Sequence, residues 1–184
     1  MNARIRTLVR TPWFWGLVGI VLLLAINTIK DPTYLAIGIN PTTGLLAGNV
    51  LDILRVSSPI IMIALGMTFV IATSGIDLSV GSIMAVGGAA AMVTPSELGQ
   101  ADSIGAMAAA VGLAVLLGAV LGAINGLLVS VVGLQPFIST LVMMLAARGI
   151  ARVITGGQNT NATNGPFKQI ANGQFFGLPI SFVV

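Results

Sequence analysis

The sequence predicts an all-α fold, a polytopic bundle of transmembrane helices in which one helix is broken near Gly75–Ser79. Hydrophobic residues make up 56% of the 184 residues and charged residues only 7%, whereas a soluble domain carries about 25% charged residues. The mean hydropathy is +1.03. Residues 103–147 carry no charged side chain. Such a composition indicates helices that are surrounded by lipid and by one another.

The same composition excludes several classes of function. Cysteine and histidine are absent, which excludes disulfides, thiol nucleophiles and Cys/His zinc sites. The phosphate-binding motif G-x-x-x-x-G-K-[ST] is also absent, so the chain is not its own ATPase. The net charge of +3 does not indicate nucleic-acid binding, because three of the eight basic residues precede the first apolar segment. We expect no catalytic residue, no cofactor and no metal.

The first apolar segment, residues 13–29, is long enough to cross the membrane. Trp13 and Trp15 supply aromatic residues at its start, as is typical of a membrane interface. The positive-inside rule then places the N-terminus in the cytoplasm, because Arg4, Arg6 and Arg10 come just before. A cleaved signal peptide is the alternative, and the lack of a good small-residue cleavage pattern disfavours it.

Two segments flank the predicted break. Residues 57–74 form the second predicted span, with Pro59 in its first turn, where a missing N–H costs little. Before it lies a mixed stretch that includes an amphipathic piece. Residues 80–93 are apolar but short for a full span, which is typical of a half-helix or a tilted segment. We expect residues 94–103 to form a polar loop.

Three further apolar segments follow. Residues 104–132 contain glycines spaced by four, a pattern that favours close helix packing in lipid; they are Gly118, Gly122 and Gly126. Residues 137–154 are the next predicted span, and 155–177 a polar loop that the alternation of spans places outside. Residues 178–184 begin another apolar run. Because that run stops after seven residues, we expect the sequence to be part of a longer chain.

Asp77 is the first candidate functional residue, since it is the only charged residue between Ile60 and Val93. A carboxylate at hydrocarbon depth costs roughly 2.5 kcal/mol or more, so it should face protein or water. Broken helices build the binding sites of many transporters. Alternatively, Asp77 only caps a helix that begins near Leu78. Asp77 can therefore be a helix cap, or a helix cap that also lines a transport pathway.

Five other residues complete the set of pathway candidates: Ser79, Asn125, Gln135, Phe137 and Arg148. An amide buried in lipid needs a partner, so an interhelical hydrogen bond is expected for Asn125. Gln135-Pro136 is typical of a turn at a helix start. Arg148 shares a helix face with Arg152. Either both extend to the outer interface, or Arg148 pairs with a carboxylate or carbonyl inside the bundle.

Three functions fit these observations. The first is a permease subunit of an importer driven by a separate ATPase. The second is an ion-coupled secondary transporter, which needs titratable groups in its spans and has only Asp77. The third is a non-transporting membrane assembly subunit, which needs no polar break.

Four blocks resemble the bacterial sugar ABC-transporter permeases, the membrane subunits of ribose, xylose and galactofuranose importers. The longest is residues 64–85, which include Ser74-Gly-Ile-Asp-Leu-Ser-Val-Gly81. Residues 125–129, residues 135–141, and Arg148 with residues 154–158 follow in order and spacing. Residues 52–55, 71–73 and 135–137 are most similar to the galactofuranose-type branch.

The resemblance implies monosaccharide import across the bacterial inner membrane by alternating access. It implies a cytoplasmic ABC ATPase, a periplasmic sugar-binding protein and a second permease copy or paralogue as partners, besides the lipid bilayer. In this family the loop that docks the ATPase lies in the second half. The resemblance therefore implies that these residues are half of a larger permease, unable to couple transport to ATP alone.

Overall fold

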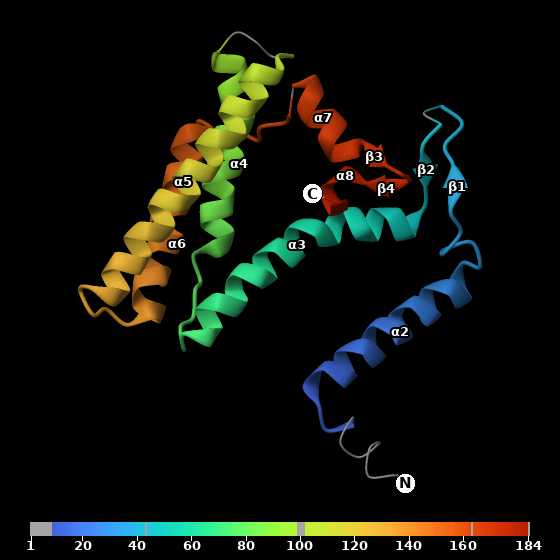
Figure 1. The fold of residues 1–184 in the computed structure, drawn as a ribbon, viewed down its shortest axis with the longest axis horizontal. Helices are drawn as coiled ribbons and strands as arrows, with labels where there is room; N and C mark the ends of the chain where they lie inside the picture. The colour runs from blue at the N-terminus through green and yellow to red at the C-terminus, as the bar shows by residue number, and fades with distance from the viewer. Residues whose placement is uncertain (1–8, 43, 99–101, 163, 184) are drawn as a thin grey trace. The chain divides into compact units, whose positions relative to one another are not determined.

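The computed structural model describes residues 9–42, 44–98, 102–162 and 164–183. The predicted all-α class is confirmed, since helices dominate the described residues and the strands among them form two short hairpins (Figure 1). The chain divides into two units, Met1–Arg55 and Val56–Val184. The helices are α2 (Pro12–Lys30), α3 (Asn49–Ala72), α4 (Val80–Glu97), α5 (Ile104–Ser130), α6 (Pro136–Ile154), α7 (Gly165–Asn172) and α8 (Ile180–Val183). The strands are β1 (Gly38–Ile39), β2 (Leu46–Ala47), β3 (Gln174–Phe175) and β4 (Leu178–Pro179).

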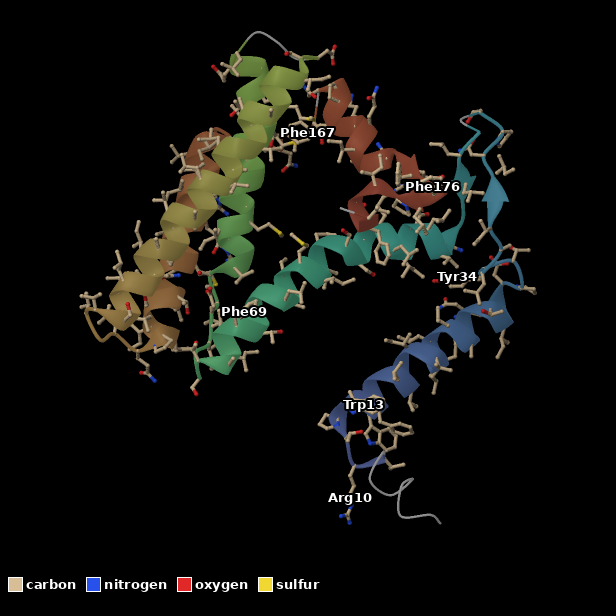
Figure 2. All side chains as sticks on the ribbon, viewed as in Figure 1. Arg10, Trp13, Tyr34, Phe69, Phe167 and Phe176 are labelled. Atoms are coloured by element: carbon tan, nitrogen blue, oxygen red, sulfur yellow. The ribbon has the colours of Figure 1, made fainter. Side chains whose placement is uncertain are left out.

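In the first unit, α2 has an aromatic N-terminal end and no buried residue. Pro12 occupies the first helical position, where its missing N–H costs nothing. The ring of Trp13 is exposed, and the indole N–H of Trp15 donates to the carbonyl of Val9 at 3.0 Å. Figure 2 shows Arg10 and Trp13 together at this end. Arg4 and Arg6 lie outside the described residues, so a cytoplasmic N-terminus stays a prediction.

The turn after α2 is stabilised by the carboxylate of Asp31. Its Oδ1 accepts hydrogen bonds from the hydroxyl of Thr33 at 2.6 Å and from the backbone N–H of Thr33 at 2.9 Å. Both bonds lower the pKa of Asp31 below its ordinary value of 3.8, and the bond from the hydroxyl has the larger effect. Because the pKa of Asp31 is lowered in the folded state, the stability that these two hydrogen bonds contribute is fully present above the unfolded-state pKa. It is lost as the pH falls through the folded-state pKa.

We therefore expect Thr33→Val to raise the pKa of Asp31 toward 3.8, because the substitution removes the larger of the two causes. The measurement is an NMR titration of the Asp31 carboxyl. Thr42→Val is the matched control, since Thr42 makes the same pair of bonds to the uncharged amide of Asn40. An unchanged Asp31 pKa in Thr33→Val would contradict the assignment.

The hairpin β1–β2 connects α2 to α3, with Gly38 opposite Ala47 and Ile39 opposite Leu46. Gly48 ends the hairpin at φ +152°, where an added Cβ would lie 2.5 Å from the carbonyl oxygen of Ala36. Only glycine fits this turn without moving the backbone.

Helix α3 begins at Asn49, eight residues before the predicted span, so Pro59 lies inside the helix and not in its first turn. Two side chains favour this earlier start. Asp52 lies in the first turn, where a carboxylate interacts well with the helix dipole, and Arg55 pairs with it at 3.5 Å. A proline inside a membrane helix is tolerated where other groups satisfy the freed carbonyl.

Helix α4 packs against both α5 and α6 in the second unit (Figure 1). Val86, Leu121, Met143 and Ala147 form the buried core between them. Gly87 faces Ala114 on α5, and a Cβ added to Gly87 would lie 3.5 Å from the Ala114 carbonyl oxygen. Helices α4 and α5 are therefore in close contact at this point.

The glycines predicted to form a packing face on α5 do not contact another helix in the described part of the chain. Apart from the adjacent backbone of α5 itself, no described atom lies within 4 Å of a Cβ added at Gly118, Gly122 or Gly126. The side of α5 that is buried carries other residues: Ala106, Ala110, Leu121 and Asn125. The rotation of α5 about its axis thus directs alanines, not the glycine row, toward α4.

Helix α4 extends four residues beyond the predicted segment, to Glu97, and takes in part of the predicted polar loop. Pro95 is buried in its last turn. The hydroxyl of Thr94 donates to the Ala90 carbonyl at 2.7 Å and that of Ser96 to the Val93 carbonyl at 2.7 Å. Because these hydroxyls bond within the helix, polar residues can continue it.

Four described helices are long and apolar enough to cross a membrane, namely α2, α3, α5 and α6. Helix α5 starts where predicted and ends two residues earlier, and α6 starts one residue earlier. The final apolar run differs, because Leu178 and Pro179 pair with β3 before α8 begins.

The start of α7 is tied to the connection between α4 and α5. The side chain of Asn164 caps α7 by accepting from the N–H of Phe167 at 3.0 Å, and its amide donates to the Ser103 carbonyl at 3.3 Å. Asp102 accepts from the N–H of Gly165 at 2.8 Å. These bonds hold Asn164 and the start of α7 beside the start of α5.

Candidate functional site: a polar junction at the helix break

The break between α3 and α4 packs against the start of α6. Helix α3 ends at Ala72, and Ser74 follows at φ 60°. The N–H of Gly75 donates to the Val70 carbonyl at 3.0 Å. A Cβ added to Gly75 would lie 3.2 Å from Val70 and 3.9 Å from Pro136. The predicted break is thus real, and it lies beside the Gln135-Pro136 turn.

Asp77 holds the turn that starts α4. Its Oδ1 accepts from the backbone N–H of Ser79 at 2.7 Å and from the Ser79 hydroxyl at 2.6 Å. The cap residue of α4 is Ser79, whose carbonyl accepts from Ser82 and Ile83. The prediction that Asp77 itself is the cap is therefore wrong, because the helix begins at Val80, two residues after Leu78. Asp77 instead stabilises the turn that precedes the helix, by accepting both hydrogen bonds from Ser79.

Asn125 of α5 is bonded to the start of α4 and to the first turn of α6. Its amide nitrogen donates to the Ser79 hydroxyl at 2.9 Å, and its amide oxygen accepts from the Ser139 hydroxyl at 3.1 Å. All three side chains are buried. The predicted interhelical hydrogen bond of Asn125 is confirmed. In a low-dielectric interior such a network is strong when every member is paired.

Two hydroxyl residues that the sequence did not single out complete the junction. Ser139 supplies the bond to Asn125, and the Thr140 hydroxyl lies within hydrogen-bonding distance of two carbonyls, that of Pro136 at 2.8 Å and that of Ile76 at 3.2 Å. A pair of hydroxyl residues near the start of a helix whose first twelve residues are otherwise apolar is the signal that could have found them. Their buried positions show that this turn contacts the break.

The remaining candidates lie apart from this network. Gln135 is the residue before α6 and makes no side-chain cap, while Pro136 occupies the first helical position, as predicted for a turn. The ring of Phe137 is 46% exposed. Arg148 is exposed, and in the described part of the chain it makes no ion pair. The structure therefore brings together only Asp77, Ser79 and Asn125 of the six.

Most polar groups of the junction bond to one another and hold the helices in place, while one carboxylate oxygen of Asp77 remains without a hydrogen bond in the described part of the chain. Ser79, Asn125 and Ser139 use their polar groups on one another. Asp77 is half-buried, and its Oδ2 makes no hydrogen bond within the described residues. No group of three His, Cys, Asp or Glu side chains that could hold a metal occurs in that part of the chain. A pathway role for these residues stays a prediction.

An apolar multi-pass chain with a polar break between helices has the architecture of a membrane permease. Residues 49–183 match the family described as branched-chain amino acid transport system / permease component. Because that match covers most of the chain, the protein belongs to this family. It is a multi-pass membrane protein and a transport permease by family.

Curated relatives include three sugar permeases. The chain is 48% identical to the fructose import permease protein FruF of Bifidobacterium longum, over 100% of this chain and 51% of that protein. It is 36% identical to the galactofuranose transporter permease protein YtfT of Escherichia coli, over 91% of this chain and 47% of that protein. It is 40% identical to the ribose import permease protein RbsC of Escherichia coli, over 79% of this chain and 40% of that protein.

The chain thus spans about half the length of the curated relatives it matches. The fructose permease shares more residues with it than the galactofuranose permease does, so these relatives do not favour the galactofuranose branch suggested by its motifs. No solved structure matches the chain significantly.

Proposed function

We propose that the protein is the membrane permease subunit of an ABC importer, and that it moves a monosaccharide across the bacterial inner membrane by alternating access. The observation that carries this proposal is the 48% identity with a fructose import permease over the whole chain. Ribose and galactofuranose permeases among the relatives support a sugar over the branched-chain amino acid of the family description.

The proposal includes three partners and an orientation. A cytoplasmic ATPase drives the change of state, a periplasmic sugar-binding protein delivers the cargo, and a second permease copy or paralogue completes the pathway. The N-terminus is cytoplasmic, in line with the basic residues that precede α2. The chain itself has no enzymatic role in this proposal, and the ATPase supplies the hydrolysis.

Uptake by the assembled transporter in a strain without other routes tests the proposal. Labelled fructose, ribose and leucine are compared, with a hydrolysis-deficient ATPase as the control. Sugar uptake that requires the active ATPase supports the proposal. Leucine uptake alone would contradict the sugar assignment, and uptake abolished by dissipating the ion gradient but not by the inactive ATPase would favour an ion-coupled transporter.

Asp77→Asn separates the structural role of Asp77 from a role in the pathway. Asparagine offers the same side-chain oxygen to the N–H and hydroxyl of Ser79, so the turn should form. If the free charge at Oδ2 faces the pathway, normal assembly with reduced sugar uptake is expected. The measurements are the amount of assembled complex and the initial uptake rate.

Asp77→Ala is the companion variant, because it removes the turn as well as the charge. Losing the bonds at a helix start costs about 1 kcal/mol, so lower assembly is expected there. Uptake by Asp77→Asn at the rate of the unsubstituted transporter would leave only the structural role.

A further inference from the structure

A pocket of about 690 Å³ lies between α4, the end of α6 and the segment that follows α6. Its apolar side consists of Ala85, Ala89 and Ala151. The other residues that line it are Arg152, Thr155, Gly157 and the exposed, polar residues 158–161. These residues lie at the opposite end of α6 from the polar junction, so the pocket is a separate feature.

A reversal of the chain creates this pocket. Helix α6 ends at Ile154, and the next two glycines adopt left-handed conformations, Gly156 at φ 60° and Gly157 at φ 74°. The N–H of Gly157 donates to the Arg152 carbonyl at 2.8 Å. This glycine-dependent end of the helix turns residues 158–161 back toward α4.

The position of the pocket along α4 matters because α4 packs on two helices that are apolar enough to span the membrane, α5 and α6. Ala85 and Ala89 lie about 8 and 14 Å along α4 from Val80, at a rise of 1.5 Å per residue. They are therefore near the middle of that helix. Irregular polar backbone at membrane depth is tolerated only where it is buried in protein or lines water.

The chemistry of the polar side selects a class of ligand. Gln158, Asn159 and Asn161 carry amides that both donate and accept hydrogen bonds, and Thr160 adds a hydroxyl that does the same. Adjacent hydroxyl groups on a ligand are also both donors and acceptors. Among the described residues that line the pocket, Arg152 is the one charged residue, and none is a carboxylate. The ammonium group of an amino acid would thus find no anionic partner.

We propose that this pocket is a binding site for a neutral polyhydroxylated solute, a sugar in transit, with the amides and the hydroxyl of residues 158–161 as its hydrogen-bonding groups. The site deepens the proposed function and depends on it. The three alanines contact the apolar face of the solute, and water fills the pocket when the solute is absent.

Thiol labelling tests the site directly in the assembled transporter, after any other cysteines have been replaced. Thr160→Cys places a thiol in the lining, and Asn172→Cys places one on the exposed end of α7 outside it. We expect a water-soluble thiol reagent, applied to cells and to inverted vesicles, to modify both. Fructose or ribose delivered by the binding protein should slow modification of Thr160→Cys severalfold and leave Asn172→Cys unchanged.

A second measurement removes the proposed contacts. Gln158→Leu/Asn159→Leu should lower the maximal rate of sugar uptake by about threefold to tenfold for each lost hydrogen bond. The control pair is Gln169→Leu/Asn172→Leu, two exposed amides of α7 that do not line the pocket. We expect that pair to transport at the unsubstituted rate.

The outcomes separate this site from the proposed function. Sugar uptake by the unsubstituted transporter with no protection of Thr160→Cys would overturn the site and leave the function standing. A Thr160→Cys thiol that is unreactive from both sides would also overturn it, because the pocket would then hold no water. No sugar uptake by the unsubstituted transporter, or protection by leucine in place of sugar, would overturn both.

Discussion

Replacing Asn125 with aspartate is expected to lower the stability of the assembled permease more than any other single change at the polar junction. Ser79 has one hydroxyl hydrogen, which it donates to Asp77. The bond between Ser79 and residue 125 therefore depends on the amide nitrogen of Asn125 as donor, at 2.9 Å. An ionised aspartate has no donor, and it would place a second carboxylate next to Asp77 with one hydroxyl between them.

A buried polar group left unpaired costs about 1–3 kcal/mol, and more when it is charged. We expect Asn125→Asp to lose at least this amount, and Asn125→Ala to lose less because it adds no charge. Thermal unfolding of the detergent-solubilised transporter measures the difference. Ser130→Asp is the control, since it adds the same charge to α5 where the hydroxyl bonds only to Gly126 of its own helix. Equal losses at both positions would contradict the network.

A large side chain at Gly87 is expected to separate α4 from α5. A Cβ at this position would lie at ordinary contact distance, 3.5 Å from the Ala114 carbonyl oxygen and 3.6 Å from its Cβ. Gly87→Ala should therefore be tolerated, while the longer side chain of Gly87→Leu is expected to press on α5, because Gly87 is buried. Overpacking of this kind costs about 1–3 kcal/mol.

Gly88→Leu is the matched control for Gly87→Leu. Gly88 is the next residue of the same helix, and no atom lies within 4 Å of a Cβ added there. The measurement is again the unfolding temperature, together with the yield of assembled transporter. A Gly88→Leu variant as unstable as Gly87→Leu would mean that the loss of glycine, and not contact with Ala114, determines the effect.

Much of the helical architecture could be predicted, because long uncharged segments have few alternatives to membrane helices. Helices α5 and α6 lie within two residues of the predicted segments. The extension of α4 could not be predicted. Thr94, Pro95 and Ser96 are typical of a loop, and only the bonds of the two hydroxyls to their own helix reveal that it continues.

The candidate site was predictable in part for a similar reason. A lone amide in an apolar segment must have a partner, so Asn125 could be singled out, but the identity of the partner depends on the rotation of α4 and α6 about their axes. Ser139 and Thr140 face the break only because of that rotation. The contact of Gly87 on α4 with Ala114 on α5 was likewise not predictable, because it depends on the rotation of both helices, whereas a packing role for the three spaced glycines of α5 stays a prediction.

The hydrogen bonds that link the side chains of Ser139, Asn125, Ser79 and Asp77 run in one direction. Ser139 donates to Asn125, Asn125 donates to Ser79, and Ser79 donates to Asp77. A proton can hop along such a row only if each member can accept one proton and release another. Hydroxyl groups can do so, whereas the amide of Asn125 donates through nitrogen and accepts through oxygen, two different atoms. The row is thus interrupted at its centre, and Asp77 is insulated from Ser139 with respect to proton movement.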